Sequence, residues 1–74
     1  METRTRIHFN GGAESIEVEE SFDAVTSKIT VVAEHTHHFH RLVGSNRNRV
    51  AIRKDAIAYV EETHYSDVPL VSVG

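Results

Sequence analysis

The sequence predicts an α+β fold: a small, strongly bent antiparallel sheet or half-open barrel in the order β-β-α-β-β-β, with one helix. Three observations predict it. Apolar residues alternate with polar ones in residues 3–9, as in a half-buried strand. An apolar stripe with helical spacing follows in residues 22–32, and three short alternating segments separated by polar turns fill residues 38–62.

The first strand is expected at residues 3–9, "TRTRIHF". Successive side chains of a strand point to opposite faces. One face therefore carries the threonines with Ile7 and Phe9, and the other carries Arg4, Arg6 and His8. We expect the first face to be buried.

A hairpin turn is expected at "NGG", residues 10–12, because Asn-Gly suits a tight turn in which both central residues have positive φ. The return strand is "SIEVE", with Ile16 and Val18 inward. Its outward Glu17 and Glu19 are placed to pair with the basic side chains of the first strand.

A helix of about three turns is expected from residue 22. Ser21 is a suitable N-cap, and Asp23 adds negative charge to the first turn. The apolar stripe consists of Phe22, Val25, Ile29 and Val32. The alternative is a short helical turn that ends at Lys28, followed by a strand over residues 29–34, where β-branched residues are concentrated.

Three more strands complete the predicted sheet. "HFHRLVG" is followed by the polar turn "GSNRN", and "RVAIR" places Val50 and Ile52 inward. "KDA" is a tight turn before the last strand, "IAYVEE", residues 57–62. By their periodicity, Phe9 and Tyr59 are expected in the core.

The 74 residues form a single domain, 1–74, with a structured core over 3–62 and an apolar C-terminal tail over 63–74. A chain of this size buries only about 60% of its unfolded surface. It has no cysteine, so the expected additional source of stability is a metal or a partner chain. The predicted oligomer interface is the apolar part of the tail: Val68, Leu70, Val71 and Val73.

Charge is unevenly distributed along the chain, although the net charge is only −3. Residues 14–23 hold five acids and no base, whereas residues 35–54 hold five bases, four histidines and no acid. We expect acidic and basic strands to lie side by side and neutralise one another. The alternative is a two-faced surface that favours self-association or a nucleic acid.

Two resemblances are visible. "FNGG", "ESFD" and "VAIRKDAIAYV" together resemble the Sm and Hfq-like barrels. This resemblance implies single-stranded RNA binding through Phe22 and Asp23 and through Arg53, Lys54 and Asp55. Asp55 stands where those barrels carry a basic residue or histidine. "IEVEESFDAV" and "RVAIRKDAIAYVEE" are similar to small, uncharacterised β-rich proteins of actinobacteria and their phages, a likeness that favours the helix and implies no activity.

Two sets of residues suggest alternative functions. Histidines at positions 35–40 would bind zinc or a similar divalent ion if they met in space; they are His35, His37, His38 and His40. A nucleic-acid backbone would be contacted by the basic residues Arg41, Arg47, Arg49, Arg53 and Lys54.

No nucleophile elbow or phosphate-binding loop occurs in the sequence. There is also no apolar run of the roughly 20 residues needed to cross a membrane. We therefore predict a non-enzymatic, cytoplasmic interaction module that acts as a homo-oligomer. It needs no cofactor in this interpretation, and single-stranded RNA is an alternative partner.

Overall fold

The computed structural model of the chain describes residues 2–31 and 33–65. Within these residues it has one α-helix, five strands and two 3-10 turns. In chain order they are β1 (Glu2–Phe9), η1 (Asn10–Gly12), β2 (Ile16–Val18), α1 (Phe22–Val31), β3 (Thr36–Val43), β4 (Asn46–Arg53), η2 (Lys54–Ala56) and β5 (Ile57–Tyr65). The predicted element order and α+β class are confirmed.

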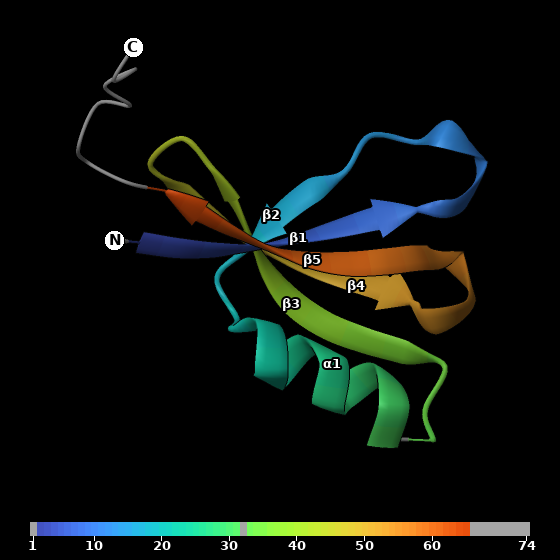
Figure 1. The fold of residues 1–74 in the computed structure, drawn as a ribbon. Helices are drawn as coiled ribbons and strands as arrows, with labels where there is room; N and C mark the ends of the chain where they lie inside the picture. Colours follow the sequence, from blue (N-terminus) through green and yellow to red (C-terminus); the bar gives the residue numbers. More distant parts are fainter. Residues whose placement is uncertain (1, 32, 66–74) are drawn as a thin grey trace, which may run out of the picture.

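All five strands belong to one bent antiparallel sheet, in the order β4-β3-β2-β1-β5 (Figure 1). The sheet is not closed, so β4 and β5 are its two edges. Strand β2 has only three residues and joins β3 through a single residue pair, Val18 with Arg41. No helix of the described residues is long and apolar enough to cross a membrane.

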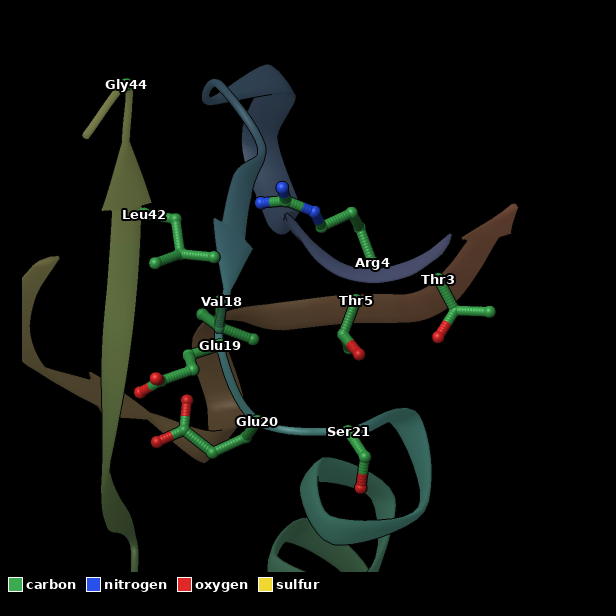
Figure 2. Close-up of a pocket in the computed structure, with 9 residues that line it drawn as sticks. All are labelled: Thr3, Arg4, Thr5, Val18, Glu19, Glu20, Ser21, Leu42 and Gly44. Atoms are coloured by element: carbon green, nitrogen blue, oxygen red, sulfur yellow. The ribbon is translucent and has the colours of Figure 1, made fainter. Parts of the chain in front are cut away.

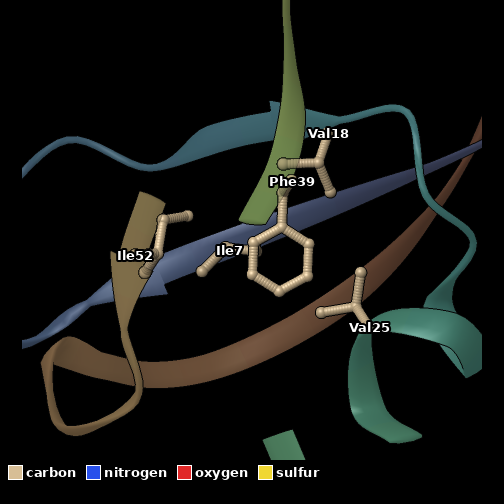
Figure 3. Close-up of a cluster of buried hydrophobic side chains, with 5 residues drawn as sticks. All are labelled: Ile7, Val18, Val25, Phe39 and Ile52. Carbon is tan, nitrogen blue, oxygen red and sulfur yellow. The ribbon is translucent and has the colours of Figure 1, made fainter. Parts of the chain in front are cut away.

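The core is small and draws on β1, β2, α1, β3 and β4. Its buried hydrophobic side chains are Ile7, Val18, Val25, Phe39 and Ile52 (Figure 3). Because α1 contributes Val25 to this cluster, the helix covers the face of the sheet that carries the core. We call this the inner face, and the opposite side of the sheet the outer face.

The first hairpin has the predicted pattern of faces but a different turn. Thr5 and Ile7 are buried, while Arg6 on the outer face binds Glu17 of β2, with Nη2 2.7 Å from Oε1. The expected Asn-Gly turn is wrong. Only the glycines have positive φ, 80° at Gly11 and 76° at Gly12, and the connection runs on to residue 15. The second glycine makes the longer connection possible, because it accepts positive φ without strain.

The helix begins as predicted and resolves the ambiguity in residues 29–34. The Ser21 hydroxyl accepts a hydrogen bond from the Ala24 N–H at 3.2 Å, which caps the first turn. Residues up to Val31 are helical, so the alternative strand is wrong there. Residues 33–34 have no regular structure, and residue 32 lies outside the described residues. Packing of Val25 and Ile29 on the core outweighs the β-preference of the branched residues.

The last three strands are longer than expected. Strand β4 begins at Asn46, so the turn after β3 is shorter than the predicted "GSNRN". Strand β5 extends through Tyr65, beyond the predicted boundary at residue 62. The register between β1 and β5 shifts at His8 and Phe9: His8 pairs with Tyr59, but Phe9 pairs with Ile57. This β-bulge changes the alternation of β5 at its start.

Candidate interaction surface

The two edge strands of the sheet, β4 and β5, carry opposite charge, and α1 lies close to β5. In antiparallel pairs, residues directly opposite share a face. Since Phe39 and Val50 are a pair on the inner face, Arg49 and Arg53 lie on the outer face, opposite His40 and Thr36. The other edge, β5, carries two exposed carboxylates: Glu61 on the outer face, opposite Arg6, and Glu62 on the inner face, opposite the buried Thr5.

The predicted basic residues do not form one patch. Arg47, Arg49 and Arg53 alternate along β4 and are all exposed. Arg41 is only partly exposed and lies on β3 opposite Asn48, whereas Lys54 belongs to η2. The structure therefore brings together the three arginines of β4, whereas Arg41 lies on the other face of the sheet and Lys54 follows Arg53 in the η2 turn.

Two of the three β4 arginines are paired with neighbouring acidic residues. Arg47 Nε lies 2.6 Å from Glu19 Oε2, and Arg53 Nη2 lies 3.1 Å from Asp55 Oδ2. Arg49 differs, because its guanidinium has no hydrogen bond or ion pair with any residue in the described part of the chain.

The Glu20 carboxylate, just before α1, forms hydrogen bonds with β3. Glu20 accepts a hydrogen bond from the His40 backbone N–H at 2.9 Å, and its Oε2 lies 2.8 Å from His40 Nδ1. The Glu19 N–H donates to the His40 carbonyl oxygen at 2.8 Å. Burial alone raises the pKa of Glu20, but the hydrogen bonds from His40 outweigh burial and hold this pKa below its usual 4.5.

The histidines proposed as metal ligands point in different directions. His37 is on the inner face, only 4% exposed, and its Nε2 has no hydrogen-bond partner. His38 and His40 lie on the outer face, and His35 precedes β3. Among residues 2–31 and 33–65, no three histidine, aspartate or glutamate side chains are placed to hold a metal ion.

Tyr59 was expected in the core and is instead on the outer face, 55% exposed. The β-bulge explains the error, because Ile57 and Val60 both pack toward the core and Tyr59 pairs with His8. The Tyr59 and His8 rings are stacked, with centroids 4.1 Å apart and planes 10° apart. Periodicity alone could not reveal this exposed aromatic ring. Phe9, in contrast, packs against the core as predicted.

The β5 carboxylate nearest to this stack is only partly engaged. Glu61 Oε1 lies 2.7 Å from His8 Nε2, while Oε2 has no partner among the described residues. The result is a fixed surface group of a phenol ring, an imidazole and a carboxylate on the β5 edge. We call Tyr59, His8 and Glu61 the outer-face cluster.

A shallow pocket of about 430 Å³ lies where β2 ends and α1 begins (Figure 2). Its charged groups are already engaged within the chain: Glu19 with Arg47, Glu20 with His40, and Arg4 with Glu17. The remaining lining is short hydroxyl side chains and aliphatic groups. The complete lining is Thr3, Arg4, Thr5, Val18, Glu19, Glu20, Ser21, Leu42 and Gly44.

The residues implied by the Sm resemblance lie at opposite ends of α1. Phe22 and Asp23 begin the helix, which spans about 15 Å over its ten residues. Lys54 lies near the other end, where its N–H donates to the carbonyl oxygen of His35, between α1 and β3, at 2.7 Å. The predicted interface residues of the tail, at positions 68–73, lie outside the described residues.

Comparisons with protein-family models, with curated proteins and with solved structures each found no match.

Proposed function

We propose that this protein is a non-catalytic interaction module that assembles with copies of itself through the free edges of its sheet. The observation that carries the proposal is the pair of edge strands with opposite charge, β4 with its arginines and β5 with its glutamates, each paired with a strand on one side only. An edge strand presents unpaired N–H and C=O groups, which form hydrogen bonds readily with another strand.

The charges select which edges meet. Two β4 strands placed side by side would bring Arg47, Arg49 and Arg53 near their own copies, and like charges across a strand pair are destabilising. Two β5 strands would do the same with Glu61 and Glu62. A β4 edge against a β5 edge, with the outer faces on one side, places the β4 arginines beside Glu61, so this combination is favoured.

The size of the core supports the same conclusion. Val50 of β4 and Val60 of β5 are only partly buried and lie at the margins of the core. Contact between the two edges would remove both side chains from water. Burial of apolar surface stabilises by roughly 25 cal/mol per Å², which matters in a domain with so few buried side chains.

The C-terminal segment is a second source of apolar contact in this proposal. Its sequence carries Val68, Leu70, Val71 and Val73 directly after β5. A chain ending at Tyr65 should therefore associate more weakly than the full chain. Unchanged association would remove the segment from the proposed interface and leave the edge strands as its sole basis.

Sedimentation velocity and native mass spectrometry of the full chain test the proposal. Assemblies of defined size should appear at micromolar concentration and dissociate as salt is added, because exposed charges are screened. Glu61→Lys on the outer face of β5 should weaken association, because Glu61 is the β5 carboxylate on the same face as the β4 arginines. Glu14→Lys is the matched control, since it makes the same change of charge in the exposed connection between β1 and β2.

A protein that stays monomeric at every concentration and salt level, with its tail present, would contradict the proposal. Equal weakening by the Glu61 and Glu14 substitutions would show that net charge, rather than the β5 edge, controls association.

A further inference from the structure

Within residues 2–31 and 33–65, one cation of the β4 edge has no partner. Arg47 and Arg53 are held by Glu19 and Asp55 at 2.6 and 3.1 Å, respectively. Arg49 lies between them on the same face and has neither a hydrogen bond nor an ion pair within residues 2–31 and 33–65. Its guanidinium is exposed and available to another molecule.

The β5 edge has a group suited to a guanidinium. The Tyr59 ring is held nearly parallel to the His8 imidazole, and more than half of the residue is exposed. The neighbouring outer-face carboxylate, Glu61, uses only Oε1 to contact His8. A planar guanidinium stacks on aromatic rings and donates to carboxylates at the same time, which an ammonium group does less well.

The topology places these two groups on the same side of an extended sheet. Successive neighbours in the order β4-β3-β2-β1-β5 are antiparallel, so β4 and β5 run in the same direction. If β4 of one copy lies beside β5 of the next with both cores on one side, the outer faces coincide. Arg49 and the outer-face cluster then share that face.

We infer that Arg49 of one copy docks on Tyr59 and Glu61 of the next copy. This contact rests on the proposed self-association and names the residues that give it specificity. The guanidinium lies against the phenol ring and donates to Glu61 Oε2. One contact of this kind joins each β4 edge to the following β5 edge.

Equilibrium sedimentation of four single variants and one double variant tests the contact. Arg49→Ala should raise the dissociation constant roughly ten-fold. Arg49→Lys should fall between the wild type and the alanine variant, because it keeps the charge but loses the planar group. Arg53→Ala is the matched control, since it removes an exposed cation of β4 that is already paired with Asp55.

The double variant separates a direct contact from two independent effects. Tyr59→Leu should weaken association by itself. In an Arg49→Ala and Tyr59→Leu double variant, the combined loss should be smaller than the product of the two single losses. Circular dichroism of each variant checks that the fold is kept. We expect the fold to be kept because both replaced side chains are exposed.

The possible outcomes distinguish this inference from the proposed function. A wild-type protein that never associates overturns both. A wild-type protein that associates with the same dissociation constant as Arg49→Ala overturns only the contact. Equal losses for Arg49→Ala and Arg53→Ala, or multiplicative losses in the double variant, also overturn the contact and leave self-association standing.

Discussion

Replacement of His37 by leucine should stabilise the protein, an unusual result for a buried residue. His37 is 4% exposed, lies on the inner face opposite Ile52, and keeps Nε2 without a hydrogen-bond partner. A buried polar group without a partner costs about 1–3 kcal/mol. Leucine has a similar volume and no such group, so we expect a gain of about 1–2 kcal/mol after some loss from imperfect packing.

Thermal unfolding followed by circular dichroism measures this gain. In a domain of this size, 1 kcal/mol corresponds to about 4–8 °C in melting temperature. The control is His38→Leu, the same change on the exposed outer face, where a shift within about 0.5 kcal/mol is expected. Protein concentration must be equal throughout, because self-association also raises the melting temperature. A lower melting temperature for His37→Leu would refute the reasoning.

Four further predictions follow from the described residues. Glu20→Gln should reduce the loss of stability at acidic pH. The fold lowers the pKa of Glu20, so its contribution to stability is present above pH 4.5 and is lost as the pH falls through the folded-state pKa. Urea unfolding measured at a series of acidic pH values checks this. Ser21→Ala should cost about 1 kcal/mol of stability in the same urea assay, because the Ala24 N–H loses its cap. A chelator should leave the melting temperature unchanged, since the described histidines do not converge. Fluorescence anisotropy with single-stranded RNA at low salt should stay flat, because Arg47 and Arg53 are already paired.

The local features of the fold were predictable from the sequence. Alternation in β1 and β2 identified Ile7 and Val18 as core residues, and Ser21 marked the helix start. These features depend on neighbours in the chain, which the pattern records directly. The end of the helix was harder to predict, because residues 29–31 prefer strands locally and are held in a helix by packing on the core.

The features that depend on distant pairing were not predictable. Tyr59 is exposed because of a bulge between β1 and β5, strands separated by most of the chain. The burial of His37 depends on its pairing with β4, and no periodic signal distinguishes it from His38. The candidate surface was not predictable either, because the sequence cannot show which strands lie at the edges of the sheet.

Repulsion between like charges can protect an edge strand from unwanted pairing with another strand, and the arginines of β4 alone would provide that repulsion. The second edge of this sheet, β5, carries the opposite charge. Protection from pairing does not need opposite charges on the two edges, whereas recognition of one edge by the other does. If copies join β4 to β5, every open assembly still has one free β4 and one free β5 at its ends. These ends have the same complementarity as the joined edges, so growth continues until the ends meet. A closed ring is the finite arrangement in which no edge of this kind remains exposed.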